Sequence, residues 1–237
     1  MIFIMGSFGS GKTSLTELLS KDLGTPAYYE DITGNQLLNN MLSKFYSNGS
    51  SSRKTVAAML QVAFLTFRYQ QLKQAIKQRN SVLDSSLESD WVVCQMLHDH
   101  GEIDDADFNV YATLSQEMQA EVNGSPWNGY PDLSVYLKIS PDNEVKSIMK
   151  RGREMEVADS NLVNYYHRVN KAYQNWSKGY TRGLLLTVDR DKLDFVDSIA
   201  DRNTTLNLIE QKLVDLGKLT PKEFSSIKKG RAAKFND

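Results

Sequence analysis

Short apolar runs alternate with longer segments of helical spacing along most of the chain. The segments expected to be helical are 13–23, 35–46, 55–77, 90–122, a segment opened by Pro141, 161–178 and 201–216. Between them lie the runs expected to be strands, at residues 2–5, 27–29, 81–84, 133–139 and 184–188. Strands that alternate with helices predict an α/β fold of three layers, in which helices flank a parallel five-stranded sheet on both sides.

The same pattern gives the expected domain organisation. No internal repeat or linker interrupts residues 1–217, so this part is predicted to be one domain. Residues 218–237 are polar and basic and are predicted to form a loosely attached C-terminal tail. The serine-rich stretch at 47–52 is the most loop-like part of the sequence.

Composition and charge exclude several classes of partner. The 237 residues contain 28 Lys and Arg and 29 Asp and Glu, so no overall field attracts nucleic acid or an anionic membrane. No apolar run approaches the ~18 residues that span a bilayer, and the first run is too short for a signal peptide. The one cysteine, Cys94, suits a reducing cytoplasm and is expected to be a small buried residue. We therefore expect a cytoplasmic protein without membrane or nucleic-acid partners.

A phosphate-binding loop follows the first predicted strand. The sequence matches G-x-x-x-x-G-K-[ST] at every fixed position, between a strand and a helix. Backbone N–H groups of such a loop bind phosphate oxygens, its lysine neutralises β- and γ-phosphate charge, and its hydroxyl ligates Mg²⁺. The predicted ATP-binding residues here are Gly6, Ser7, Phe8, Gly9, Ser10, Gly11, Lys12, Thr13 and Ser14. Lys12 is also predicted to be catalytic, and Thr13 to be a metal ligand.

Two carboxylates lie at the carboxyl ends of predicted parallel strands. Asp84 ends the strand at 81–84, where folds with this loop place an acid beside the metal. Glu30 closes the strand at 27–29, near where a phosphate acceptor would lie, and there it could accept the proton of an attacking hydroxyl. Position alone leaves open that Asp84 only forms a turn and that Glu30 is a solvated strand end.

Cations cluster at the end of the helix that Pro141 opens. Lys150, Arg151 and Arg153 fall within four residues, as expected of a lid that closes over a phosphoryl group. Arg151 and Arg153 are the predicted catalytic cations of this lid, and Arg151 is also expected to contact ATP. The alternative is a solvated helix end whose cations face the negative end of the helix dipole.

With these motifs in order, the chain resembles the deoxynucleoside kinases, particularly the bacterial deoxyadenosine/deoxyguanosine kinases. The resemblance runs from Met1 to about Leu216. It covers the phosphate loop, the segment from Tyr29 to Tyr46, the pair seven residues apart on the long helix, the acidic motif at 84–90 and the lid. It also covers a loop near residue 191. It implies ATP-dependent transfer to the 5′-hydroxyl of a deoxynucleoside, with purines preferred, and a homodimer or a heterodimer with a paralogue.

The resemblance also implies individual roles. Glu30 would deprotonate the 5′-hydroxyl, Gln61 and Arg68 would read the base together with Asp90, and Tyr46 and Glu156 would hold the 3′-hydroxyl. Phe45 and Phe64, with Phe67, either sandwich the base or belong to the core. The predicted substrate residues are Glu30, Phe45, Tyr46, Gln61, Phe64, Arg68, Asp84, Asp90 and Glu156. Asp191, Lys192 and Phe195 are implied to cover the adenine of ATP.

Two departures from the family pattern leave a second hypothesis open. Ser85 stands where the family has an arginine after the acid, and Ser147 stands where the lid usually has its first arginine. Lys146 and Lys150 are close enough in sequence to compensate for Ser147, and Glu88 and Trp91 suggest a remodelled pocket. The alternative to an active kinase is therefore a nucleotide-binding regulatory subunit with weak or no phosphotransfer.

Overall fold

Five parallel strands form the centre of the structure, a computed structural model that describes residues 1–30, 34–47, 49–123, 129–157 and 162–233. The strands are β1 (Ile2–Met5), β2 (Ala27–Tyr28), β3 (Val82–Asp84), β4 (Leu133–Lys138) and β5 (Leu185–Asp189). Their order in the sheet is β2-β3-β1-β4-β5, and every neighbouring pair is parallel. The predicted parallel five-stranded sheet is confirmed.

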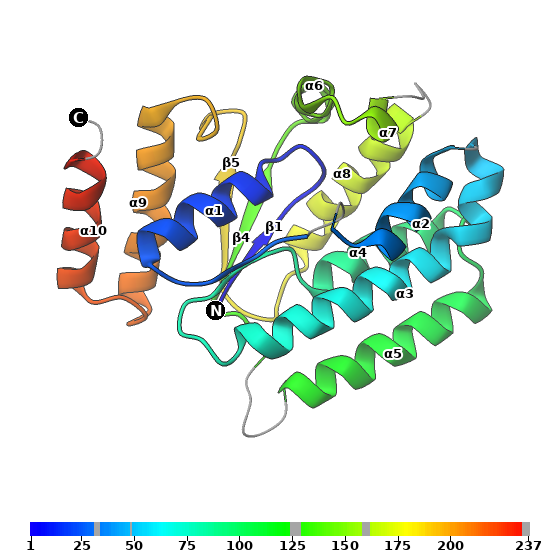
Figure 1. The fold of residues 1–237 in the computed structure, drawn as a ribbon, viewed down its shortest axis with the longest axis horizontal. Coiled ribbons are helices and arrows are strands. Elements are labelled where there is room, and N and C mark those ends of the chain that lie inside the picture. Colours follow the sequence, from blue (N-terminus) through cyan, green and yellow to red (C-terminus); the bar gives the residue numbers. More distant parts are fainter. Residues whose placement is uncertain (31–33, 48, 124–128, 158–161, 234–237) are drawn as a thin grey trace.

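Both faces of the sheet are covered, because successive side chains of a strand point to opposite faces. Ile2 and Ile4 pack in one apolar cluster with α1 (Lys12–Leu23) and α9 (Ile199–Asp215). Phe3 and Met5, one residue out of phase, pack in a second cluster on the other face. Figure 1 shows the resulting layers, with α1 and α9 on one side of the sheet and α3, α4 and α8 on the other.

In the part of the chain that the structure describes, seven further helices follow between β2 and β5, and all but α5 contribute residues to the site described below. They are α2 (Gln36–Ser47), α3 (Gly49–Ala75), α4 (Leu87–Asp99), α5 (Asp105–Asn123), α6 (Pro141–Arg151), α7 (Glu154–Val157) and α8 (Leu162–Lys178).

One expected boundary was wrong, and one predicted helical segment is divided. Residues 90–122 are mostly helical, as expected, but they belong to two helices, because Gly101 takes the left-handed conformation (φ +67°) just after α4 ends. The serine-rich stretch is only partly a loop, since the backbone from Gly49 onward already belongs to α3, and residue 48 lies outside the described residues. Serine lowers helix propensity only modestly, so the long apolar continuation of α3 decides the conformation.

The C-terminal segment forms a helix, α10 (Pro221–Ala233), which lies against α9 at the edge of the molecule (Figure 1). Its buried Arg231 donates to Asp22 (2.6 Å), Glu210 (2.7 Å) and Asn207 (2.7 Å). These contacts attach the helix to α1 and α9. A polar composition did not indicate them, because one buried arginine leaves no periodic pattern.

No helix among these described ranges is long and apolar enough to cross a membrane.

Candidate active site

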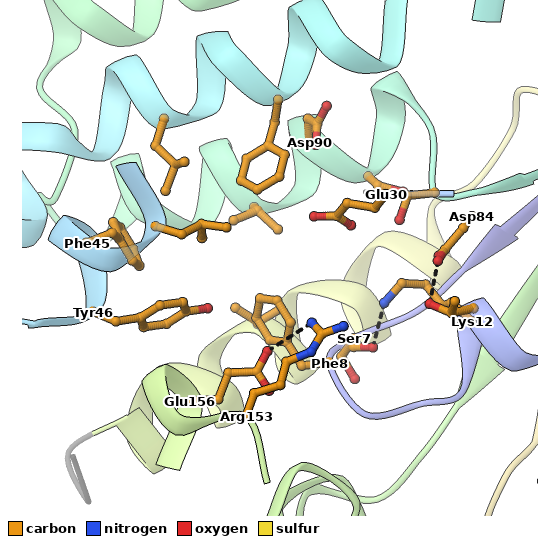
Figure 2. A pocket seen from close by; sticks show the side chains of 18 of the residues that line it. Ser7, Phe8, Lys12, Glu30, Phe45, Tyr46, Asp84, Asp90, Arg153 and Glu156 are labelled. Atoms are coloured by element: carbon orange, nitrogen blue, oxygen red, sulfur yellow. Dashed lines mark hydrogen bonds and ion pairs between the residues drawn. The ribbon is translucent and has the colours of Figure 1, made fainter. Parts of the chain in front are cut away.

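A cavity of about 710 Å³ opens at the carboxyl ends of β1 and β3. Its walls come from the phosphate loop, from α2, α3, α4 and α8, and from the segment between α6 and α7 (Figure 2). The structure brings together here most of the residues that the sequence singled out. They are Gly6, Ser7, Phe8, Lys12, Thr13, Glu30, Phe45, Tyr46, Gln61, Phe64, Arg68, Asp84, Asp90, Arg151, Arg153 and Glu156.

The phosphate loop turns sharply between β1 and α1, and its glycines make that turn possible. A Cβ at Gly6 (φ +152°) would lie 2.9 Å from the carbonyl oxygen of Leu137, and Gly11 (φ +92°) caps α1 in the left-handed region. The N-terminus of α1, with its positive dipole and free N–H groups, begins at the floor of the cavity. This end of the cavity is therefore suited to an anion.

Lys12, the first residue of α1, lies against the loop. Its ammonium donates to the carbonyl oxygens of Gly6 and Ser7, both at 2.9 Å (Figure 2). Burial lowers the pKa of Lys12, while the nearby carboxylates of Asp84 and Glu30 oppose this change. The ammonium thus lies between the loop and the two carboxylates that end β3 and follow β2.

Thr13 and Asp84 place two oxygen donors side by side at this end of the cavity. The Thr13 hydroxyl donates to Oδ2 of Asp84 at 2.5 Å, and Oδ1 of this buried carboxylate has no hydrogen-bond partner. Burial raises the pKa of Asp84, because the charged carboxylate is poorly solvated there. A bound cation would stabilise that charge. Hard oxygen donors of this kind suit Mg²⁺, so these two residues fit the predicted metal.

Glu30, Arg68 and Asp90 form a chain of charges along one wall. The strand end that carries Glu30 is fixed by Gln71, whose amide donates to the carbonyl oxygen of Tyr29 at 2.6 Å. Arg68 donates to Glu30 Oε2 at 3.2 Å and, through Nε, to Asp90 Oδ1 at 2.6 Å. Burial raises the pKa of Asp90 although the guanidinium of Arg68 opposes it. Gln61 lies buried about two turns from Arg68 on α3 and lines the same cavity.

The opposite end of the cavity is aromatic and is closed by the lid residues. Phe45 and Tyr46 pack edge-to-face on each other, and Phe45 does the same with Tyr165 of α8. Glu156 accepts hydrogen bonds from Arg151 (2.5 Å) and Arg153 (3.4 Å), as Figure 2 shows for the second. Arg151 and Arg153 thus line the cavity although both side chains keep contact with solvent, while Lys150 is exposed and pairs with Asp197.

Ser86, in the acidic motif after β3, has a structural role that the sequence did not indicate. The Ser86 hydroxyl caps α4 by accepting from the N–H of Ser89, while the Ser89 hydroxyl accepts from the N–H of Ser86. This reciprocal cap fixes the start of α4 and hence the position of Asp90 in its first turn.

Residues expected to contact adenine take positions outside this cavity. Phe195 is fully buried beneath the phosphate loop, where a Cβ on Gly11 would lie 3.1 Å from its ring. Asp191 accepts from the backbone N–H of Ser140 (3.0 Å) and from Asn143 (2.8 Å), and so anchors the start of α6. Lys192 is exposed and lies 3.8 Å from Asp189.

The structure does not support the expected remodelling of the pocket by Glu88 and Trp91, or the expected compensation for Ser147 by Lys146 and Lys150. Trp91 packs on Phe108 and Tyr111, and Glu88 accepts from the indole of Trp176 (3.0 Å), so neither remodels the cavity wall. The two lysines near Ser147 do not replace a lid cation, because they are exposed and directed elsewhere. Lys146 donates to Asn143 and Lys150 to Asp197.

Other residues support the site without any signal in the sequence that singles them out. Arg190 donates to the carbonyl oxygen of Ser10 (3.0 Å) and lies over the Phe195 ring (4.2 Å). Tyr165 and Tyr173 of α8 line the cavity. The tyrosine-rich composition of residues 161–178 indicated a helix, but only its packing decides which face meets the cavity.

A buried carboxyl group lies behind the phosphate loop. Glu144 of α6 is fully buried and accepts from Asn170 at 2.7 Å, and Asn170 also donates to Ser7 Oγ at 3.3 Å. Burial raises the pKa of Glu144 to about 7, although hydrogen bonds from Ser7 and Asn170 favour its charged form.

Glu144→Gln is therefore expected to increase the free energy of unfolding at pH 8. The folded state binds the Glu144 proton more tightly than the unfolded state, so stability falls as pH rises from about 4.5 to 7. A neutral glutamine removes this cost, about 3 kcal/mol at pH 8 for a shift from 4.5 to about 7, and removes nothing below pH 4. Urea denaturation of both proteins at pH 4 and pH 8 measures the difference, and an equal effect at both values would contradict the assignment.

The fold and the site together define a P-loop phosphotransferase: a parallel sheet, a glycine loop before α1, a metal-suited Thr–Asp pair and converging lid arginines. A family model, Deoxynucleoside kinase, matches residues 2–215. The chain belongs to the deoxynucleoside kinase family.

Curated relatives agree with this assignment over nearly the whole chain. A deoxyguanosine kinase of Lactobacillus acidophilus is 38% identical, over 92% of this chain and 93% of its own. A deoxyadenosine kinase of the same organism is 34% identical, over 92% of this chain and 99% of its own. A solved structure of deoxyadenosine kinase from M. mycoides with bound dATP has a TM-score of 0.70 and 26% identity, and covers 90% of this chain and 98% of its own.

Proposed function

We propose that this protein transfers the γ-phosphoryl group of ATP to the 5′-hydroxyl of a deoxynucleoside. The observation that carries the proposal is the order of groups along one cavity. The phosphate loop and Lys12 lie at one end, Glu30 lies beside them, and Gln61 and Asp90 line the same wall beyond. A nucleoside whose base meets Gln61 and Asp90 would present its 5′-hydroxyl to Glu30.

In this mechanism Glu30 accepts the proton of the 5′-hydroxyl while that oxygen forms its bond to the γ-phosphorus. The bond between the γ-phosphorus and the bridging oxygen breaks, and ADP leaves with that electron pair. Lys12, Arg151 and Arg153 stabilise the negative charge on the transferred group, because preorganised cations act where charge develops. Tyr46 and Glu156 hold the sugar at the aromatic end of the cavity.

Thr13 and Asp84 would hold Mg²⁺, which supplies charge neutralisation between the β- and γ-phosphates. The support is the 2.5 Å contact between their oxygens and the free Oδ1 of Asp84.

Purine deoxynucleosides are the proposed substrates. Relatives at 34–38% identity are named deoxyguanosine and deoxyadenosine kinases. A more distant relative of Bacillus subtilis, at 28%, is named a deoxyadenosine/deoxycytidine kinase, so deoxycytidine belongs among the compounds to test.

The cellular setting and assembly follow as further parts of the proposal. We place the enzyme in the cytoplasm, where its single buried Cys94 remains a thiol. A homodimer, or a heterodimer with a paralogue, remains the proposed assembly. A concave surface between α4 and α8, lined in part by Trp91 and Trp176, supports it because aromatic side chains are enriched in interfaces.

Purified protein with ATP, Mg²⁺ and each of the four deoxynucleosides tests the proposed activity. Deoxyguanosine or deoxyadenosine is expected to give the highest kcat/KM, and EDTA is expected to abolish turnover. Monophosphate and ADP are measured separately, so that hydrolysis of ATP by water is distinguished from transfer. A protein that binds ATP and a deoxynucleoside but forms no monophosphate would instead be the regulatory subunit.

A further inference from the structure

Glu30 pairs in this cavity with a cation that the long helix α3 supplies. Lys12, Arg68, Arg151 and Arg153 line the described part of its wall. Lys12 donates to loop carbonyls, and the two lid arginines pair with Glu156. Within that described wall, Arg68 is the cation that hydrogen-bonds Glu30, at 3.2 Å.

Ser85, the residue after Asp84, cannot serve as a cationic partner of Glu30. Ser85 follows Asp84, lines the cavity, and is held in the left-handed region (φ +81°) with its N–H bound to the carbonyl oxygen of Ile4. Its short neutral side chain supplies no charge. Lys12 acts on Glu30 only through space, so the cation that hydrogen-bonds Glu30 comes from α3, at Arg68.

Arg68 is held at three points. Nε donates to Asp90 at 2.6 Å, one terminal nitrogen donates to Glu30, and the other lies 3.4 Å from the backbone carbonyl oxygen of Asp84. A guanidinium is planar and rigid, so a shift that improves one contact changes the others. Arg68 is buried, which strengthens each interaction relative to water.

The Asp90 end of this arrangement has an unused hydrogen-bond acceptor. Oδ2 of Asp90 is buried without a hydrogen-bond partner in the described structure, and Asp90 lines the cavity. A donor on a base edge would satisfy that oxygen, and so would change how firmly Asp90 holds Arg68.

We propose that Arg68 is a positioning residue for Glu30, and that it couples the base bound at Asp90 to the rate of phosphoryl transfer. The proposal rests on the kinase function above. If Arg68 acts in this way, two bases differ in kcat as well as in KM. The difference in KM comes from direct contact with the base.

The test separates base binding by Arg68 from its positioning of Glu30. It does so by supplying a cation from residue 85. Arg68→Lys keeps the charge but cannot reach Asp90 and Glu30 together, and is expected to lower kcat at least tenfold. Adding Ser85→Arg supplies a guanidinium from the residue that follows Asp84 and lines the same cavity. Arg68→Lys is also expected to raise KM for the preferred deoxynucleoside. The double variant is expected to recover kcat at least fivefold over Arg68→Lys and to keep the raised KM. The ratio of kcat values for deoxyguanosine and deoxyadenosine is expected to approach one.

Arg231→Lys is the matched control, because Arg231 is equally buried among Asp22, Glu210 and Asn207 but lies far from the cavity in α10. It is expected to lower Tm as Arg68→Lys does and to leave kcat unchanged. Each variant is checked by its melting curve and by calorimetric titration with deoxynucleoside.

The outcomes distinguish this inference from the function on which it rests. A wild-type protein without transfer activity would overturn the kinase proposal itself. An active wild type whose Arg68→Lys variant keeps its kcat and loses only KM would show Arg68 to be a base contact alone. A double variant that folds and binds nucleoside without recovering kcat would also contradict the positioning role.

Discussion

Lys12→Ala is expected to lower kcat/KM for ATP-dependent phosphorylation at least ~10³-fold. Lys12 is the cation at the turn of the phosphate loop, and its loss removes the charge that meets the β- and γ-phosphates. A single preorganised donor at developing charge typically contributes ~10²–10³ in rate, and Lys12 adds a full charge in a partly buried setting. Steady-state formation of monophosphate measures the effect.

Lys21→Ala is the control for this substitution. Lys21 lies on the same helix, but it is exposed and pairs with Glu17 on the surface, so activity and stability should be nearly unchanged. Lys12→Ala leaves the carbonyl oxygens of Gly6 and Ser7 without their donor, so Tm is measured with kcat. A folded Lys12→Ala protein with near-normal activity would overturn the assignment of the phosphate loop.

Glu30→Gln is expected to lower kcat by about 10²–10⁴ with little change in the affinity for deoxynucleoside, because it removes a general base and preserves shape. The glutamine oxygen can still accept from Arg68, so the wall of the cavity should keep its arrangement. Single-turnover kinetics with calorimetric titration separate the chemical step from binding.

Glu88→Gln serves as the comparison, since Glu88 is similarly exposed (16% against 20% for the Glu30 side chain) but points to Trp176 outside the cavity. It should leave kcat within about twofold of wild type. Equal losses of binding and turnover in Glu30→Gln would make Glu30 a ligand anchor and not the base.

The local pattern of the sequence determined the sheet and the phosphate loop. Strands such as Ile2–Met5 are short and uniformly apolar, and uniform burial on both faces is what a central parallel strand requires. The glycine loop is equally local, because its chemistry is built from consecutive backbone N–H groups and one following lysine. Such features depend on neighbours in the chain, so spacing alone is enough to predict them.

Helix boundaries were predicted less well, because they depend on competing terminal interactions. The break at Gly101 inside the segment 90–122 gave only a weak signal, since one glycine costs a helix about 1 kcal/mol and is often tolerated. The attachment of α10 through Arg231 was invisible, because its partners lie on α1 and α9.

The sequence by itself thus determined which residue types the site contains, and the tertiary structure decided what each one faces. Lys150 and Arg151 are adjacent, yet Lys150 pairs with Asp197 on the surface and Arg151 faces the cavity. Phe195 and Phe45 are both buried aromatics, yet the first supports the phosphate loop and the second lines the pocket. Arg68 could be matched to a base-reading position, but its contact with Glu30 joins residues 38 positions apart. Hydrogen bonds and burial depend on distances between elements that are remote in sequence, and only the packing of α3 and α4 on the sheet sets those distances.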